Sequence, residues 1–249
     1  MSTDPPNPGR PAGREAASEG VVPVIAVDGP SGSGKGTVAR LLARRLGWHL
    51  LDSGALYRIV GLAAVTRGVA LDDATALGTL VAALDIRFID DPGAEALGIE
   101  VDGAEVGDAI RTEEVGEAAS QVAQVPSVRE GLFALQQRLR TPPGLIADGR
   151  DMGTVVFPDA PLKIFLTASA EERARRRYKQ LMDKGFAASL PALVQSLEAR
   201  DARDQDRALS PLRPAVDAVI IDSTSMSPDA VMARVLDALR ARGLDASGA

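Results

Sequence analysis

A nine-residue segment near the start of the chain has the composition and spacing of a loop that binds phosphate. Residues 29–37 read GPSGSGKGT, with Lys35 directly after the last glycine of a Gly-x-x-x-x-Gly-Lys pattern. Glycines let backbone N–H groups approach phosphate oxygens closely, and the Lys35 ammonium adds positive charge. An ordinary glycine-rich turn is the alternative. A β-branched apolar run before the loop and a helical pattern after it favour the phosphate site.

The residue after this lysine departs from the common form of the loop. Many such loops place Ser or Thr there, and its hydroxyl ligates magnesium; this chain has Gly36, with Thr37 one position later. We therefore expect Mg²⁺ to be held mainly through water and phosphates, with Thr37 as a weak or water-mediated ligand. No Asn-Lys-x-Asp guanine-recognition segment occurs in the sequence. The Gly-Lys-Gly-Thr ending resembles nucleoside monophosphate kinases.

A second segment, LDSGALYR at 51–58, supplies groups that can face the phosphate loop from the next strand. Asp52 and Ser53 come at the end of that strand. The forked donors of Arg58 suit a second phosphate. The alternative is an N-cap serine followed by a surface arginine.

A third segment, ADGRDMG at 147–153, follows another apolar run. Ligand sites of open α/β sheets lie at the carboxyl ends of strands, so Asp148, Arg150 and Asp151 are expected near the crevice. Asp148 is a candidate carboxylate for ordering a magnesium-bound water. A turn with a surface ion pair is the alternative.

Two later helical segments are rich in arginine. Residues 171–180 carry Arg173, Arg176 and Arg177 within about one turn, and residues 199–207 place Arg200, Asp204 and Arg207 on one face. Solvated faces with local ion pairs are the alternative for both. Like charges on one helix face repel one another, so their presence beside a phosphate loop favours anion binding.

The elements that must position these residues alternate between strand and helix. The pattern predicts an open, parallel α/β sheet flanked by helices. An alternating apolar and polar stretch at 85–106 predicts a small antiparallel insert. The strands are expected at 21–29, 48–53, 144–149, 162–168 and 217–223. The helices are expected at 37–46, 54–67, 73–83, 112–123, 127–140, 170–184, 189–207 and 227–242.

The composition excludes several classes of protein. The 249 residues include no cysteine and one histidine, which removes disulfides, thiolate zinc sites and multi-histidine metal sites. The net charge of −6 argues against bulk nucleic-acid binding. No apolar run reaches the ~20 residues of a membrane span, and no signal-peptide pattern begins the chain. We expect a cytoplasmic protein whose ends, 1–20 and 243–249, are disordered or frayed.

Taken together, these segments resemble the bacterial cytidylate kinase family. WHLLDSGALYR, LIADGRDMGTVVFPDAPLKIFL, EERARRR and ARDARDQDRALSPL join the glycine-rich loop in family order, across roughly residues 22–240. The resemblance implies a P-loop kinase fold with a five-stranded parallel sheet. It divides residues 21–242 into a core (21–52, 141–168 and 208–242), a monophosphate-binding region (53–140, with its insert at about 80–112), a short lid (about 170–184) and an acceptor-site helix (about 189–207).

The resemblance also implies an activity: transfer of a phosphoryl group from ATP, with Mg²⁺, to CMP or dCMP. Lys35, Arg176 and Arg150 would be catalytic. Asp148 and Thr37 would be the protein groups nearest magnesium. The residues that would hold ATP are Gly29, Ser31, Gly32, Ser33, Gly34, Lys35, Gly36, Thr37 and Arg176. The residues that would hold the acceptor are Ser53, Arg58, Ser120, Arg129, Arg150, Asp151, Arg200, Asp204 and Arg207.

Two other interpretations stay open at this point. One is a kinase that uses the same scaffold for another monophosphate or a small metabolite. The other is a nucleotide-binding regulator without transferase activity, although a regulator needs no second phosphate pocket. The resemblance implies small-molecule substrates, no nucleic-acid or membrane partner, and a monomer.

Overall fold

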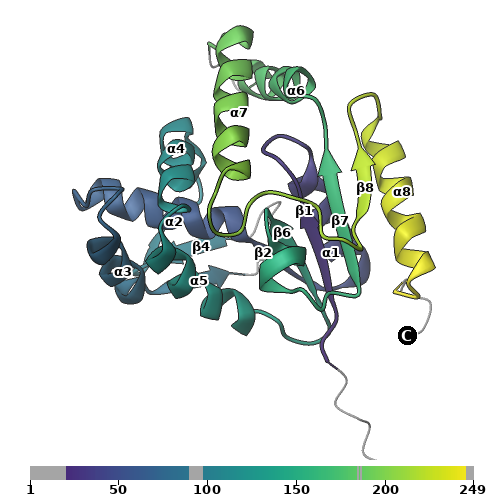
Figure 1. Ribbon diagram of the computed structural model, residues 1–249, viewed down its shortest axis with the longest axis horizontal. Coiled ribbons are helices and arrows are strands. Elements are labelled where there is room, and N and C mark those ends of the chain that lie inside the picture. The colour runs from purple at the N-terminus through teal and green to yellow at the C-terminus, as the bar shows by residue number, and fades with distance from the viewer. Residues whose placement is uncertain (1–20, 90–97, 184, 186, 245–249) are drawn as a thin grey trace, which may run out of the picture.

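A five-stranded parallel sheet forms the centre of the molecule in the computed structural model, which describes residues 21–89, 98–183, 185 and 187–244 (Figure 1). The strand order is β2-β6-β1-β7-β8, so β1 lies in the middle. The predicted parallel sheet is thus confirmed. The predicted tails lie outside the described residues, except for positions 243 and 244. The strands of this sheet are β1 (Val24–Asp28), β2 (His49–Asp52), β6 (Leu145–Gly149), β7 (Leu162–Thr167) and β8 (Val219–Asp222).

Eight α-helices lie in the described part of the chain, at or close to their predicted positions. Several begin where the sequence offers a suitable start: Asp73 and Ser227, for example, accept hydrogen bonds from the first N–H groups of α3 and α8. The helices are α1 (Lys35–Leu46), α2 (Ser53–Thr66), α3 (Ala74–Ala83), α4 (Glu113–Val122), α5 (Pro126–Arg138), α6 (Ala170–Asp183), α7 (Leu190–Gln205) and α8 (Pro228–Ala241).

Alternate residues of the central strands feed two separate hydrophobic cores, as expected for a sheet covered on both faces. On β1, Val24 and Ala26 join one core with α2–α5, while Ile25 and Val27 join the other with α1 and α8. In Figure 1, α2, α3, α4 and α5 lie to the left of the sheet and α8 to the right. Both cores hold the strands in register, which keeps their carboxyl ends together.

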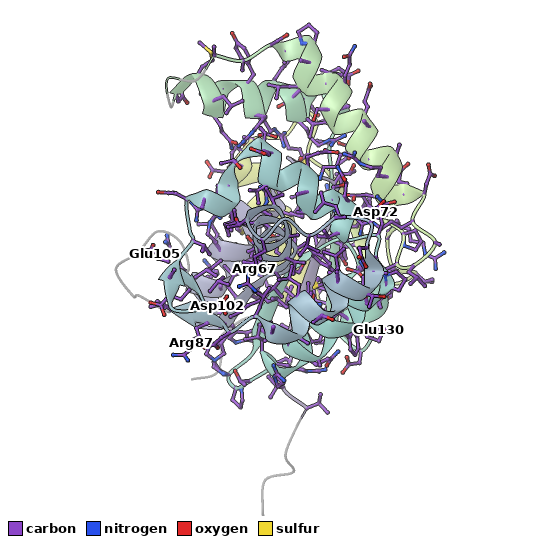
Figure 2. All side chains as sticks on the ribbon, turned by 90° about the vertical axis from the view of Figure 1, so that its left-hand side faces the viewer. Arg67, Asp72, Arg87, Asp102, Glu105 and Glu130 are labelled. Carbon is purple, nitrogen blue, oxygen red and sulfur yellow. The ribbon has the colours of Figure 1, made fainter. Side chains whose placement is uncertain are left out.

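The predicted antiparallel insert is a three-stranded sheet in the described residues: β3 (Ile86–Ile89), β4 (Gly98–Val101) and β5 (Ala104–Glu105). Residues 90–97 of the predicted insert lie outside the described part. Asp102 and Gly103, both with positive φ, form the two-residue turn between β4 and β5. Figure 2 shows Arg67, at the end of α2, beside Asp102, with which it forms an ion pair of 2.5 Å.

Two short helices were not predicted: η1 (Ala109–Arg111) and the π-helical turn η2 (Met152–Val156). The π-helical turn begins within the ADGRDMG segment. Helices α6 and α7 lie beyond the carboxyl ends of the strands, at the top of Figure 1. Within the described ranges, no helix is both long and apolar enough to cross a membrane.

Candidate active site

The glycine-rich loop joins the carboxyl end of the central strand β1 to the first turn of α1. Gly29 has φ 153°, and a Cβ there would lie 2.0 Å from the carbonyl oxygen of Leu166. Gly34, the N-cap of α1, has φ 94°. Both positions therefore require glycine. The loop places the N-terminus of a twelve-residue helix at the carboxyl end of β1, which is the geometry of a phosphate site.

Lys35 is buried within the loop that carries it. Its Nζ donates a hydrogen bond of 3.1 Å to the carbonyl oxygen of Pro30. Burial lowers the pKa of Lys35, and the charges of Arg150 and Arg200 lower it further, while Asp148 acts in the opposite direction. Charged residues at the end of β6 and on α7 therefore lie close enough to Lys35 to change its pKa.

The arginines of α6 separate into different roles. Arg176 donates to the carbonyl oxygens of Ser33 (3.3 Å) and Ser223 (2.6 Å), so it lies against the phosphate loop. Arg173 is 3% exposed, donates to the Ser31 carbonyl oxygen at 3.0 Å and pairs with Asp201. Arg173 and Arg176 therefore do not form one anion-binding face as predicted. Arg173 instead links α6 to α7 and to the loop, through its ion pair with Asp201 and its hydrogen bond to Ser31.

Arg177, the third arginine of this turn, is directed to another part of the molecule. It pairs with Glu113 of α4, and Arg203 of α7 pairs with Glu117 of the same helix. These two ion pairs join α6 and α7 to α4.

Asp148 lies at the end of β6, where its Cα pairs with that of Asp52 on β2. Burial raises the pKa of Asp148, nearby Lys35 lowers it, and Asp52 raises it again. A Cβ on Gly36 would lie 3.1 Å from Asp148 Oδ2, so Gly36 leaves the carboxylate its space. Thr37 lies on the first turn of α1 and is exposed.

Asp148 and Thr37 can be compared with the oxygen ligands that the predicted Mg²⁺ would need. The described residues contain no cluster of three or more His, Cys, Asp or Glu side chains that could enclose a metal. Mg²⁺ in nucleotide enzymes commonly uses one or two protein oxygens and completes its shell with phosphates and water. A single carboxylate beside the phosphate loop fits that requirement.

A group of arginines converges opposite the loop. Arg150 Nε donates to Asp204 Oδ2 at 2.8 Å, and Arg207 pairs with the other oxygen of the same carboxylate. Burial alone would raise the pKa of Asp204, but Arg150 and Arg207 lower it to about 2. Burial, and then the charge of Arg150, lower the pKa of Arg200 to about 10. The cluster therefore carries more positive charge than Asp204 neutralises.

Buried donors in this cluster also lack partners. The Nε atoms of Arg200 and Arg207 have no hydrogen-bond partner in the described structure. Buried polar atoms are almost always paired, so unpaired donors of one sign are suited to bind an anion. The cluster is therefore suited to a phosphate group.

Arg58 approaches the same region from α2. Its Nη1 donates to the carbonyl oxygens of Ile110 (2.8 Å) and Thr112 (3.1 Å). A Cβ on Gly116 of α4 would lie 2.9 Å from Arg58 Nη2, so this glycine makes room for the guanidinium. Arg58 is therefore held in place from one side, and its charge contributes to lowering the pKa of Arg200.

Arg129 and Asp151 form a largely buried ion pair, with side-chain exposures of 11% and 3%. The Arg129 guanidinium carbon lies 5.8 Å from the centre of the Tyr57 ring. Such a pair presents one donor and one acceptor on neighbouring groups, which suits a base edge. Their predicted companions are also buried: Ser53 Oγ donates to the Asp148 carbonyl oxygen at 2.8 Å, while Ser120 Oγ has no partner in the described structure.

Asp28, which the sequence interpretation did not single out, lies beside the candidate site. It is 5% exposed and accepts hydrogen bonds from the N–H groups of Met152 (2.9 Å) and Gly153 (2.8 Å). The available signal was its place directly before the phosphate loop, where an acidic residue ends an otherwise apolar strand.

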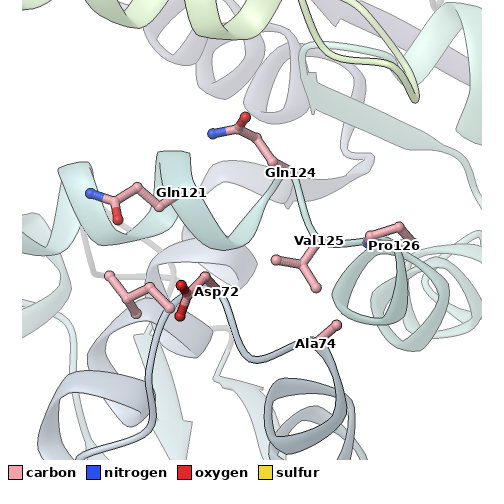
Figure 3. Close-up of a pocket in the computed structure, with 7 residues that line it drawn as sticks. Asp72, Ala74, Gln121, Gln124, Val125 and Pro126 are labelled. Carbon is pink, nitrogen blue, oxygen red and sulfur yellow. The ribbon is translucent and has the colours of Figure 1, made fainter.

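The cavities do not all coincide with these residues. A pocket between the α2–α3 turn and α4–α5, which includes Asp72 and Gln121, contains none of the predicted site residues (Figure 3). A second cavity, of about 270 Å³, is lined by Tyr57, Arg129 and Gln136 among others and adjoins the Arg129–Asp151 pair. The chemistry therefore concentrates at the strand ends rather than in the pocket of Figure 3.

A parallel sheet with a phosphate loop after its central strand, faced by converging arginines, defines a P-loop kinase. The family model described as cytidylate kinase matches residues 25–241, and the chain belongs to the cytidylate kinase family. A cytidylate kinase of Pseudomonas aeruginosa is 58% identical over 226 residues, covering 91% of this chain and 99% of that protein. A cytidylate kinase of Aeromonas salmonicida is 56% identical over 216 residues, covering 87% of this chain and 93% of that protein.

Proposed function

We propose that this protein transfers the γ-phosphoryl group of ATP to CMP or dCMP, giving ADP and CDP or dCDP. Family membership supports the reaction. The observation that carries it within the site is a buried Arg129–Asp151 pair beside an arginine cluster with unpaired donors. The pair suits a base and the cluster suits its phosphate, so the two together fit a nucleoside monophosphate.

The acceptor base is recognised by complementary hydrogen bonding. Cytosine has a donor at its N4 amino group and acceptors at N3 and O2. The Asp151 carboxylate accepts from N4, and the Arg129 guanidinium donates to N3 or O2. Uracil carries a carbonyl at C4, which faces the carboxylate unfavourably. The partnerless hydroxyl of Ser120, together with Ser53, supplies further contacts to the base.

The acceptor phosphate lies among Arg58, Arg150 and Arg207, and its sugar lies against Arg200 and Asp204. Forked guanidinium groups bind phosphate through paired hydrogen bonds. They also hold the attacking oxygen in line with the γ-phosphorus. Alignment of the two substrates supplies a large part of the rate enhancement in such reactions.

ATP phosphates bind the N–H groups of the glycine-rich loop. On binding, they draw the Lys35 ammonium away from the Pro30 carbonyl oxygen, and Lys35 and Arg176 neutralise charge on the transferring group. Arg150, between Asp204 and the loop lysine, lowers the charge repulsion between the two substrates. Asp148 and Thr37 are the residues that would hold Mg²⁺, which would neutralise charge on the phosphates when bound.

The same proposal assigns movement to two regions. Residues 53–140 form the monophosphate-binding region and residues 170–184 the lid. The ion pair from Arg177 to Glu113 of α4 connects them in this structure, and the pair from Arg203 to Glu117 joins α7 to the same helix. Closure of the lid over the substrates excludes water, which otherwise competes as the phosphoryl acceptor.

The test is an initial-rate comparison of five acceptors with ATP and Mg²⁺: CMP, dCMP, UMP, AMP and GMP. The proposal predicts preferential turnover of the two cytidine nucleotides. Equal or faster turnover of another acceptor would indicate a kinase for a different monophosphate. Binding of ATP without turnover of any acceptor would indicate a regulator.

A further inference from the structure

Asp28 connects two parts of the candidate site, the strand before the phosphate loop and the turn after Asp151. It is the last residue of β1, directly before Gly29, and its Cα pairs with that of Gly149 on β6. Its two carboxylate oxygens accept from two successive N–H groups: Oδ1 from Met152 and Oδ2 from Gly153. These are the first two residues of η2.

The two N–H groups that Asp28 accepts from would otherwise be unpaired. The first N–H groups of any helical turn lack partners within the turn, and they carry partial positive charge. A carboxylate with one oxygen for each N–H satisfies both. Because Asp28 is buried, water does not replace it there.

Asp151 immediately precedes these two residues. It is the N-cap of η2, and its own carbonyl oxygen accepts from Val155 (2.9 Å) and Val156 (3.1 Å). The backbone after Asp151 is therefore fixed in two ways. Asp28 accepts from the N–H groups of Met152 and Gly153, and the hydrogen bonds of the π-helical turn return to the Asp151 carbonyl oxygen. The side chain of Asp151 pairs with Arg129 from this position.

We propose that Asp28 is a positioning residue for recognition of the acceptor base. Its carboxylate holds the start of η2 and so fixes Asp151 against Arg129. This inference rests on the proposed function, in which Asp151 and Arg129 recognise cytosine. It adds a direct link between base recognition and the strand end that begins the phosphate loop.

The substitution Asp28→Asn tests this assignment with almost no change of volume. An amide presents one oxygen and one NH₂ group, so it accepts from one N–H and turns a donor toward the other. We expect the ratio of kcat/KM for CMP to that for UMP to fall about tenfold, while the KM for ATP changes less. If the asparagine variant does not fold, Asp28→Ser, which also keeps at most one of the two bonds, is measured instead.

A double-mutant cycle with Asp151→Asn separates positioning from a general structural effect. If Asp28 acts through Asp151, the double variant loses no more CMP preference than Asp151→Asn alone, within about threefold. The matched control is Asp73→Asn, since Asp73 also accepts from two backbone N–H groups, those of Thr75 and Ala76, but at the start of α3. Its CMP preference should equal that of the parent.

The outcomes are distinguishable. Equal losses with CMP and UMP in Asp28→Asn, or losses that multiply in the double variant, would overturn the positioning role while leaving the proposed function intact. A parent protein without preference for CMP would overturn the proposed function itself.

Discussion

The carboxylate of Asp148 faces Gly36 so closely that a Cβ at position 36 would lie 3.1 Å from its Oδ2 atom. This relationship accounts for the missing hydroxyl after the loop lysine. A serine at that position would crowd a buried carboxylate that shares its surroundings with Lys35. We therefore propose that the protein oxygen nearest to Mg²⁺ would come from Asp148 of β6 rather than from the loop.

The substitution Gly36→Ser should therefore lower activity even though it restores the more common loop sequence. We expect kcat to fall by about tenfold or more, because displacement of catalytic groups by a fraction of an ångström is costly. The Mg²⁺ concentration needed for half-maximal rate should also change. The measurement is the initial rate at saturating ATP and CMP across a Mg²⁺ titration. Gly107→Ser, in a loop outside the site, is the control; parent-like kcat and Mg²⁺ dependence in Gly36→Ser would contradict this account.

Removal of the loop ammonium should have a larger effect. In Lys35→Ala the transferring phosphoryl group loses a charged donor, and loss of such a donor typically costs ~10²–10³-fold in rate. We expect kcat to fall by at least that factor. A thermal unfolding curve like that of the parent would show that the fold is retained. Activity within about tenfold of the parent would remove Lys35 from its catalytic role.

Gly116→Ala should disturb Arg58 without disturbing the fold. Alanine favours a helix over glycine by up to ~1 kcal/mol, and the atom it meets, Arg58 Nη2 at 2.9 Å, is the end of a flexible side chain. The guanidinium therefore moves and the acceptor loses a phosphate contact. We expect the KM for CMP to rise about tenfold, with the KM for ATP and the thermal stability near parent values.

Two comparisons make the Gly116 result specific. Arg58→Ala should raise the KM for CMP similarly, and the double variant should be no worse than Arg58→Ala. Gly78→Ala, another glycine inside a helix, is the control for the change in helix propensity. A parent-like KM in Gly116→Ala would show that Arg58 does not depend on this glycine.

The buried Asp28 carboxyl predicts a pH-dependent contribution to stability. Burial raises its pKa from 3.8 to about 6, although the Met152 and Gly153 N–H groups oppose the shift. Because the folded-state pKa lies above the unfolded value, the contribution is full below about pH 4 and is lost as the pH rises through about 6. The full shift corresponds to about 3 kcal/mol.

The substitution Asp28→Asn isolates this contribution, because an asparagine side chain does not ionise. The altered hydrogen bond changes the free energy of unfolding of Asp28→Asn by an amount that does not depend on pH. As the pH rises from 4 to 7, the variant should gain about 2–3 kcal/mol of stability relative to the parent. Urea unfolding at several pH values measures the difference. A difference that stays constant with pH, or that moves in favour of the parent as the pH rises to 7, would contradict the raised pKa.

Most of the fold was predictable because local signals and global packing agree. The apolar runs at 21–29 and 144–149 became the central strands β1 and β6, and Asp73 and Ser227 began helices as expected. The π-helical turn η2 was not predictable, because it depends on a carboxylate more than 120 residues earlier in the chain. No local pattern encodes that contact.

The sequence placed many of the candidate residues at one end of the sheet, but it did not predict which of them pair with one another. Sequence spacing placed Arg173, Arg176 and Arg177 on one turn. Arg176 keeps a local pair with Glu172, but the partners outside α6 come from α7, the phosphate loop with Ser223 after β8, and α4. The role of Gly116 was also hidden, because its significance lies in the space it leaves for an arginine on another helix. Such relationships follow from tertiary packing rather than from helical periodicity.

Direct competition between CMP and UMP tests the central claim most simply. With both acceptors at equal concentration in one reaction with limiting ATP and Mg²⁺, the initial ratio of CDP to UDP equals the ratio of their kcat/KM values. The account predicts that CDP forms in large excess and that Asp151→Asn reduces this excess. Equal formation of CDP and UDP by the parent, or consumption of ATP without either diphosphate, would contradict it.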